Sequence, residues 1–147
     1  MFARIVQLIA LLLVASAALA VAQPLSPAPA YRVIVHPRNP LNSVERGQLS
    51  DAFLKKSTRW SDGEAMQPVD QLGDSAARRK FTEDVLRRSI AAVKSYWQQQ
   101  IFSGRDIPPP ELESDGAVRD YVLKHRGAVG YVSGSADVSG VKVVAVR

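Results

Sequence analysis

The sequence predicts an α/β fold, a three-layer α/β/α sandwich built around a small mixed sheet. Residues 31–35 (YRVIV) form a β-branched run that is apolar on both faces, as expected of a strand covered by helices on each side. Similar runs at 128–133 and 141–146 are separated from the first by segments with helical periodicity. We therefore expect strands and helices to alternate along a single domain that covers residues 31–147.

The N-terminus has the pattern of a targeting segment. Arg4 supplies a positive charge, residues 5–14 (IVQLIALLLV) are apolar, and small residues follow. This pattern predicts a signal peptide over residues 1–22, cleaved after Ala20 or Ala22, and a periplasmic or secreted protein. An uncleaved anchor is the alternative, although the apolar run is short for a membrane span. Residues 23–30 are predicted to be a Pro-rich spacer.

The charge balance narrows the range of partners. Nineteen Lys and Arg against 14 Asp and Glu give a net charge of +5, and loss of Arg4 with the signal peptide would leave +4. The pI near 9.8 favours anionic partners. The one dense basic cluster, residues 78–80, is not interleaved with aromatic residues, so we expect no nucleic-acid partner. The chain has no Cys, which excludes disulfides, so an exported domain must be held together by its core.

The first half of the domain shows a strand, a helix and a short strand in sequence. Turn residues at 39–42 (NPLN) follow the first strand. Asn42 or Ser43 is expected to cap a helix that ends near residue 56, with Glu45 in its first turn. Trp60 precedes a turn and is expected to be a buried plug, and residues 66–69 can form a short strand.

Two helices follow, each preceded by a capping residue. Asp74 or Ser75 is predicted to cap the first. Ser89 is predicted to cap the second, which Gly104 ends. The apolar stripes are Ala77, Phe81, Val85 and Leu86 in the first helix and Ile90, Val93, Trp97 and Ile101 in the second. The aromatic residues of the second helix, Tyr96, Trp97 and Phe102, are expected to lie in the core.

The last part of the chain predicts an edge strand, a helix and two strands. Residues 111–113 can form a brief edge strand after the rigid 107–110 segment (IPPP). Ser114 or Asp115 is predicted to open the last helix. Gly130, in the middle of the 128–133 strand, suggests a close approach to another backbone.

The start of the helix after residue 74 is the best candidate binding site. A helix that begins just after a strand presents unpaired N–H groups and the positive end of its dipole, which suits an anion. We predict anion binding by Ser75, the backbone N–H groups of Ala76 and Ala77, and Arg78. A cation in the first turn opposes the helix dipole, and either a bound anion or Asp74 would offset this cost. The alternative is a simple N-cap without a ligand.

No pattern in the sequence indicates catalysis, a metal site or a cofactor. His36 and His125 are the only histidines, and neither has a partner at a metal-binding spacing. Nucleophile-elbow, zinc-protease and phosphate-loop motifs do not occur. The clustered carboxylates are expected to be solvated acids on turns: Asp62, Glu64, Asp70 and Asp74. We therefore predict a protein that is not an enzyme.

Five phrases along residues 31–135 occur in a familiar order and spacing: VIVHPRNPL, AFLKKSTRWSDG, DSAARRKF, YWQQQIFSGRDIPPP and GAVGYVSG. Together they resemble the phosphate-type substrate-binding proteins of bacterial ABC transporters, and above all the short, single-lobe relatives of that family. The resemblance implies one lobe of a type II periplasmic binding fold, matched to the second lobe. Full-length members are two-lobed clamps that hold phosphate with helix N-termini and hydroxyl groups.

The sequence departs from the ligand loop of that family at two places. The family carries Ser-Gly-Thr at the helix start, where this chain has Ser75, Ala76 and Ala77. Gln71 stands where the family's Arg is expected. One hydroxyl group and one guanidinium group are therefore missing from the implied phosphate site.

Two functional interpretations follow from the resemblance and its departures. The first is an exported, non-enzymatic binding protein that resembles the substrate-binding component of a phosphate transporter and binds phosphate-like anions weakly at best. The alternative is a periplasmic protein–protein interaction module that kept the single-lobe fold but lost ligand binding. The implied partners are phosphate or a similar small anion, an inner-membrane transporter or sensor, or a second copy of the chain.

The predicted signal peptide is tested by the N-terminus of the protein in cells. Mass spectrometry of protein from the cell envelope should show a new N-terminus at Val21 or Gln23, because cleavage is expected after Ala20 or Ala22. An intact Met1 in a membrane fraction would support the uncleaved anchor instead.

Overall fold

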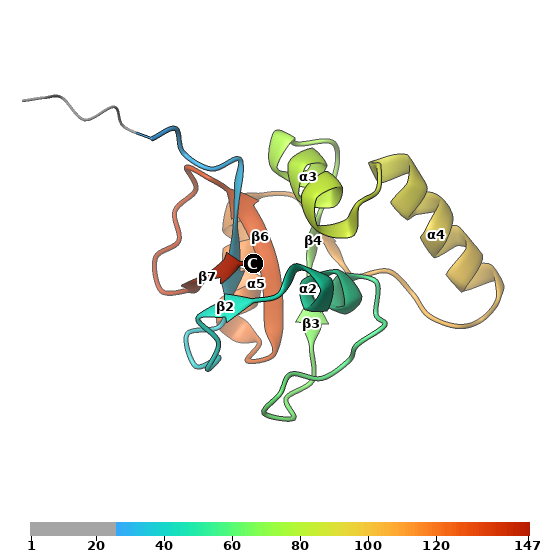
Figure 1. Ribbon diagram of the computed structural model, residues 1–147, viewed down its shortest axis with the longest axis horizontal. Coiled ribbons are helices and arrows are strands. Elements are labelled where there is room, and N and C mark those ends of the chain that lie inside the picture. Colours follow the sequence, from blue (N-terminus) through green and yellow to red (C-terminus); the bar gives the residue numbers. More distant parts are fainter. Residues whose placement is uncertain (1–25) are drawn as a thin grey trace, which may run out of the picture.

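A computed structural model describes residues 26–147, and it confirms the predicted α/β sandwich with a mixed sheet (Figure 1). A five-stranded sheet has the order β2-β7-β1-β6-β3, and a separate two-stranded sheet joins β4 to β5. The strands are β1 (Tyr31–Val35), β2 (Ser43–Val44), β3 (Gln67–Pro68), β4 (Asp70–Gln71), β5 (Glu111–Leu112), β6 (Ala128–Ser133) and β7 (Lys142–Val146). The helices are α2 (Arg46–Phe53), α3 (Ala76–Phe81), the π-helix η1 (Thr82–Leu86), α4 (Ile90–Phe102) and α5 (Asp115–Lys124).

Strand β1 is central and is buried from both sides, as its sequence predicts. It pairs antiparallel with β6 along its whole length, from Tyr31 opposite Ser133 to Val35 opposite Val129. It also pairs antiparallel with β7. Because successive side chains point to opposite faces of a sheet, Val33 and Val35 join one apolar cluster and Ile34 joins the other.

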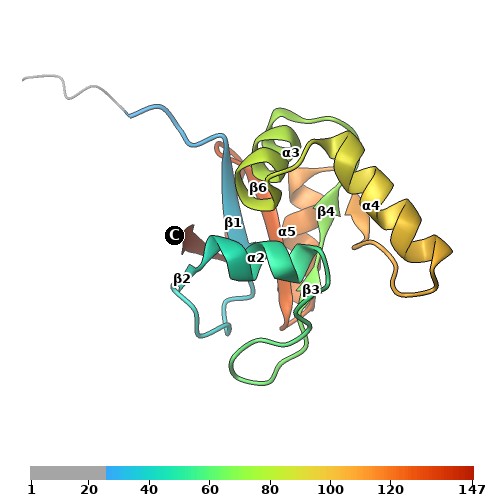
Figure 2. The ribbon, with the colours of Figure 1, turned by 45° about the vertical axis from the view of Figure 1, so that its right-hand side comes forward.

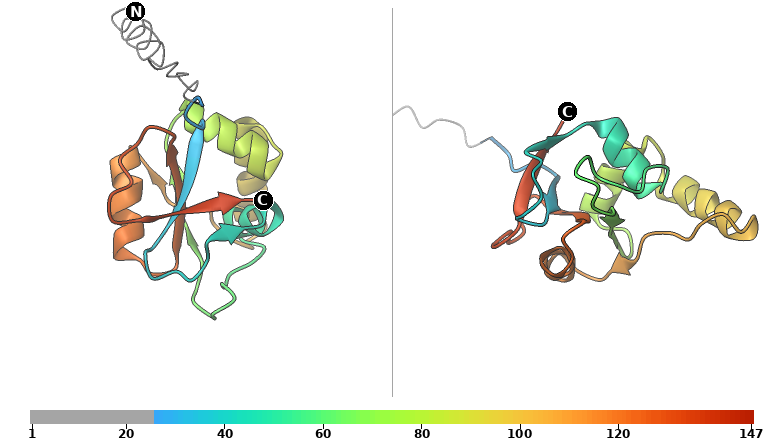
Figure 3. Two further views of the ribbon diagram at one scale, coloured as in Figure 1. Left: turned by 60° about the vertical axis from the view of Figure 1, so that its left-hand side comes forward. Right: turned by 90° about the horizontal axis from the view of Figure 1, so that it is seen from below.

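Helices cover both faces of this sheet (Figure 3). The larger cluster lies under α2, α3 and η1, where Phe81 stacks on Tyr131 with ring centroids 4.0 Å apart. The smaller cluster lies under α5, which contributes Val118 and Val122. Each layer therefore has its own core, and the sheet is the wall between them.

The helix caps show where local sequence decides the structure. Ser75 and Ser89 are N-caps, as predicted, and so is Ser114. The cap predicted for the first helix is wrong, because α2 begins after Glu45. Residues Ser43–Val44 instead form β2, which pairs in parallel with the end of β7. This pairing depends on a strand 102 residues away in sequence, which the local pattern cannot show.

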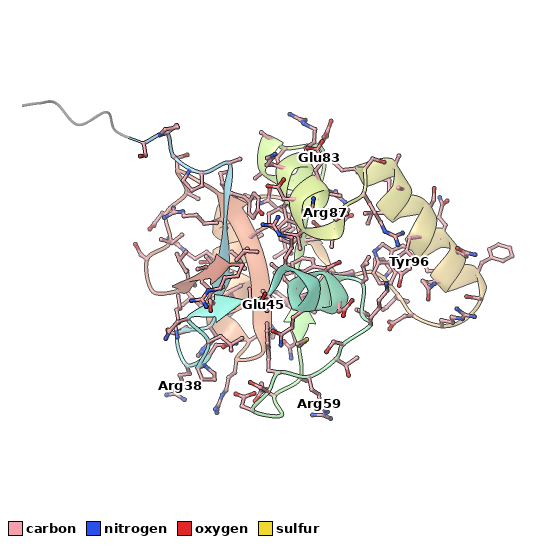
Figure 4. The ribbon with its side chains drawn as sticks, viewed as in Figure 1. Arg38, Glu45, Arg59, Glu83, Arg87 and Tyr96 are labelled. Carbon is pink, nitrogen blue, oxygen red and sulfur yellow. The ribbon has the colours of Figure 1, made fainter. Side chains whose placement is uncertain are left out.

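Helix α4 packs at the edge of the molecule and extends beyond it (Figure 2). Val93 and Trp97 are buried, and the Tyr96 hydroxyl donates a hydrogen bond to the Leu54 carbonyl at 3.0 Å (Figure 4). Phe102 is 96 % exposed, so its predicted place in the core is wrong. The apolar periodicity identifies the face of α4 that packs on the rest of the domain. The last turn of α4, which carries Phe102, extends past the surface on which that face packs.

Two buried residues join distant segments. Trp60 is buried, as predicted, and its indole N–H donates to the Gly127 carbonyl at 2.9 Å. A Cβ atom on Gly130 would lie 2.7 Å from Val118 Cγ1 and 2.9 Å from Val69 Cγ1. The close approach at Gly130 is therefore to side chains and not, as expected from the sequence, to another backbone.

The N-terminal predictions fall partly outside the described residues. The signal peptide predicted for residues 1–22 and the first three residues of the 23–30 spacer lie outside the described residues. Residues 26–30 are exposed and form neither helix nor strand. Within residues 26–147, no helix has the length and apolar character needed to cross a membrane.

Candidate functional site

The short β4–β5 sheet brings together residues that are 41 positions apart in the sequence. Asp70 is the register partner of Glu111, and Gln71 is the partner of Leu112. Helix α3 begins five residues after the end of β4, and α5 begins three residues after the end of β5. The predicted anion-binding residues therefore lie beside two carboxylates that the sequence does not place there.

Ser75 is held in place by hydrogen bonds on both sides of its hydroxyl group. Its Oγ accepts the Arg78 amide hydrogen at 3.0 Å and donates to Gln71 Oε1 at 2.9 Å. The Gln71 amide group in turn donates to Asp115 Oδ1 at 2.8 Å and to the Tyr131 carbonyl at 3.0 Å. The one hydroxyl proton of Ser75 is thus already used within the protein.

The two alanines of the predicted site differ in exposure. Ala76 is exposed, and Ala77 is buried in the larger core cluster. Their amide groups are the first two of α3, so by the geometry of a helix start they make no intrahelical hydrogen bond. These two N–H groups are the part of the predicted anion site that remains without an intrahelical partner.

Arg78 is buried and paired with the protein's own acids. Its side chain is 3 % exposed, and it donates to Glu111 Oε1 at 2.8 Å and to the Gly73 carbonyl at 3.0 Å. Asp70 Oδ2 lies 3.6 Å from the same guanidinium group. Burial alone would lower the pKa of Arg78, but the charges of Asp70 and Glu111 outweigh it and raise that pKa. Arg78 is therefore a charged, internally paired residue.

Asp70 corrects one expectation from the sequence, because it is not a solvated turn acid. It lies on β4 with its side chain 14 % exposed. Its Oδ1 accepts the Tyr131 hydroxyl proton and the Gln71 amide hydrogen. Burial raises the pKa of the Asp70 carboxyl, although Tyr131, Arg78 and the Gln71 amide each act to lower it. Burial, followed by the charge of Asp70, also raises the pKa of Tyr131.

A pocket of about 190 Å³ opens above this cluster, between α4 and the segment that leads into β5. Asp70, Arg78 and Glu111 lie on its polar side. Lys94 and Gln98 of α4 also line it. Its apolar lining consists of Val93, Trp97, Ile101, Pro108 and Pro109. We refer to it as the β4–β5 pocket.

An exposed apolar surface adjoins this pocket. We call it the α4 tip and define it by Ile101, Phe102 and Ile107, which are 53 %, 96 % and 65 % exposed. Ile101 is also a wall of the β4–β5 pocket, and Ile107 precedes its Pro108 wall. Ile101 therefore connects the tip to the pocket.

The histidines and acids elsewhere form no shared centre. His36 Nδ1 accepts the Arg38 amide hydrogen at 3.1 Å, and His125 Nδ1 lies 2.7 Å from the Tyr121 carbonyl on α5. Within residues 26–147, no three His, Cys, Asp or Glu residues lie close enough together to hold a metal ion.

Sequence reasoning missed the acids and the tyrosine of this site. Asp70 and Glu111 meet only because β4 and β5 pair, and Tyr131 reaches Asp70 from β6. A polar residue at the end of a short strand beside a predicted helix start was the available signal for Asp70. Glu111 had no comparable signal, because the 107–110 segment gives no indication of its strand partner.

Comparisons with known proteins agree with this fold. No protein-family profile and no curated protein sequence matches the chain. Among solved structures, one from Clostridium perfringens, described as a phosphate ABC transporter substrate-binding protein with bound phosphate, has a TM-score of 0.60 and 20 % identity. An ABC-type phosphate transport receptor from Vibrio cholerae has the same two values, and PstS from Borrelia burgdorferi has a TM-score of 0.59 and 10 % identity.

These matches establish the fold as that of one lobe of a periplasmic binding protein. Each covers 80 % of this chain but only 44 %, 46 % and 47 % of the three solved chains. The chain therefore spans less than half the length of the structures it matches. At this level of identity the fold is shared, and the choice of ligand has to be argued from this chain's own residues.

The raised pKa of Asp70 predicts how stability depends on pH. A carboxyl group that binds its proton more tightly in the folded chain than in the unfolded chain stabilises the fold at low pH. This contribution is lost as the pH rises from about 3.9 through the folded-state pKa. We therefore expect the wild type to lose stability relative to Asp70→Asn as the pH rises from about 4. The measured quantity is the unfolding free energy of the wild type minus that of the variant, from urea denaturation, and this difference should fall. A difference that grows with pH would contradict this prediction.

Proposed function

We propose that this chain is an exported, non-enzymatic binding protein that recognises a protein partner through the α4 tip and the adjoining β4–β5 pocket. The periplasmic-binding-protein fold and the predicted signal peptide support a role in the cell envelope. This role is the alternative interpretation of the sequence, a periplasmic protein–protein interaction module. An inner-membrane transporter or sensor, or a second copy of the chain, is the partner expected in that compartment.

One observation carries this proposal: both side chains expected to hold a small anion, those of Ser75 and Arg78, are engaged within the protein. The Ser75 hydroxyl donates to Gln71, and Arg78 pairs with Glu111 and lies close to Asp70. A free anion at this place meets carboxylates that already neutralise the guanidinium group. By contrast, Phe102 is almost fully exposed and follows the exposed Ile101 on α4, and exposed apolar surface is typical of interaction sites.

A second candidate function is weak binding of phosphate or a similar anion by Ser75, Ala76, Ala77 and Arg78. Two observations support it. The first two amide groups of α3 make no intrahelical hydrogen bond, and structural neighbours are described as phosphate-binding. A small anion at an open surface makes few hydrogen bonds and competes with water, so such binding would be weak.

The partner proposal is tested by site-specific photo-crosslinking in cells that produce the protein. A photoreactive residue in place of Phe102 should give a discrete cross-linked product, because this position lies on the proposed interface. The same residue in place of Arg38 is the control, since Arg38 is exposed and lies away from α4 (Figure 4). Mass spectrometry of the product distinguishes a second copy of the chain from another protein. No product at position 102, or equal products at both positions, would contradict the proposal.

The anion candidate is tested by titrating phosphate into the isotope-labelled protein. If it is right, the amide signals of Ser75 through Arg78 should shift first, and the shifts should weaken with added salt. Ser75→Ala should weaken binding about 10-fold, the usual effect of losing one hydrogen bond to a charged group. Ser114→Ala is the matched control, because it removes the N-cap of α5 instead. If millimolar phosphate moves no amide near Ser75, anion binding is excluded for this chain.

A further inference from the structure

We propose that the partner is a second copy of this chain, in a dimer in which Phe102 of each copy enters the β4–β5 pocket of the other. This inference rests on the proposed partner-binding function and names the partner. Three observations carry it. Helix α4 is packed on one side only, its exposed side has very little charge, and an exposed apolar ring lies next to a pocket of matching size.

Helix α4 is held by its own domain along one narrow side. Of its 13 residues, only Val93 and Trp97 are buried. Figure 2 shows the helix at the edge of the molecule, with its C-terminal end directed away from the sheet. Most of the stability of a helix in a protein comes from packing against other elements. A second packing partner on the exposed side would therefore stabilise α4.

The exposed side of α4 includes one face that is nearly free of charge. Its members recur at spacings of three and four residues, so they lie on the same side of the helix. We call it the α4 face, and it consists of Ala91, Lys94, Ser95, Gln98, Ile101 and Phe102, all exposed. Lys94 is its one charged residue, and α4 contains no acid. Depletion of charged residues is the compositional mark of interface cores.

This lack of charge favours a second copy over a membrane surface. A helix that lies on a membrane usually carries several Lys and Arg residues on its polar side, whereas α4 carries Lys94 alone. The chain has a net charge of +5, so its copies repel one another through most orientations. The α4 face adds one charge from each copy and so allows two copies to approach with little repulsion.

The β4–β5 pocket matches the ring of Phe102 in size and character. Its volume is about 190 Å³, and an apolar cavity of roughly 150 Å³ is large enough to hold benzene. Trp97, Ile101 and Pro108 belong to its apolar lining. The two carboxylates and two cations of the lining balance in charge, so an uncharged group fits there. Within its own chain, the Phe102 ring is 96 % exposed.

An antiparallel pair of α4 helices places each ring at the pocket of the other copy. When the two helices cross at Gln98, Phe102 of one copy lies level with Lys94 of the other, because both are four residues from Gln98. Lys94 and its neighbour Val93 line the pocket. The Gln98 side chain has both donors and an acceptor, so the two copies of Gln98 can hydrogen-bond to each other at the crossing. The dimer is closed, because each contact occurs twice.

The association of the pure protein tests this inference. A helix of 13 residues is about 20 Å long, so the contact is smaller than the roughly 1,200 Å² of a stable interface and the dimer is weak. Sedimentation of protein purified from the cell envelope, at micromolar to millimolar concentration, should show reversible dimers. Phe102→Ala should weaken dimerisation at least about 10-fold. Val143→Ala is the control, since Val143 is an exposed apolar residue on β7, and it should leave dimerisation unchanged.

Disulfide trapping tests the antiparallel arrangement. The chain has no Cys, so a single introduced Cys reports only on its own contact. Gln98→Cys should form an intermolecular disulfide under mild oxidation, because the two copies of this residue meet at the crossing. Gln99→Cys is the matched control and should stay reduced. Gln99 is exposed on the same helix but is turned by about 100° from Gln98.

The Trp97 indole signal tests whether the ring enters the pocket. In the labelled wild type this signal should shift as the protein concentration rises, and in Phe102→Ala it should not. Because Phe102 is exposed, the variant should keep the wild-type thermal unfolding temperature, which checks that it is folded. A Trp97 signal that does not depend on concentration would overturn the inference.

Three further results would overturn it: a monomer at every concentration, equal effects of Phe102→Ala and Val143→Ala, or equal disulfide formation at positions 98 and 99. A monomeric pure chain together with a different protein cross-linked at position 102 in cells would reject the second copy and leave the proposed function in place. Flotation with vesicles of anionic phospholipid that Phe102→Ala abolishes would assign the α4 tip to a membrane and overturn both proposals.

Discussion

The buried guanidinium group of Arg78 is the constraint on which the β4–β5 end of the molecule depends. Removing a cation from water costs several kcal/mol unless it is paired and hydrogen-bonded. The partners of Arg78 come from three places: Glu111 on β5, Asp70 on β4, and the Gly73 carbonyl before α3. Two strands of two residues each are too short to be stable alone. Pairing with Arg78 fixes their position relative to the helix.

The same constraint explains why this helix start differs from an open anion site. Once Arg78 is buried with two acids, the polar groups around it must also find partners, because an unpaired buried polar group is costly. Gln71 meets this need by connecting Ser75 to Asp115 and to the Tyr131 carbonyl. The result is a hydrogen-bonded network that links the starts of α3 and α5 to the central sheet. The hydroxyl and guanidinium groups expected to bind a ligand are used to hold the fold.

The sequence predicts what depends on neighbouring residues and misses what depends on distant pairing. The two-sided burial of β1 follows from its own β-branched run, and the N-caps Ser75 and Ser89 follow from side chains that reach only their own helix. The short strand β2 and the burial of Asp70 depend on partners about 40 to 100 residues away. No local pattern encodes such partners. For the same reason the sequence groups Ser75 to Arg78 at one helix start but does not show the acids that pair with Arg78.

The α4 tip and the pocket contribute different properties to one surface. Apolar residues at the centre of an interface supply most of the affinity, whereas charged groups mainly set specificity and orientation. Ile101 belongs to both parts, so it connects the exposed apolar tip to a pocket that also carries charged side chains. In the proposed function, the apolar tip therefore supplies affinity, and the charged side chains of the pocket supply specificity.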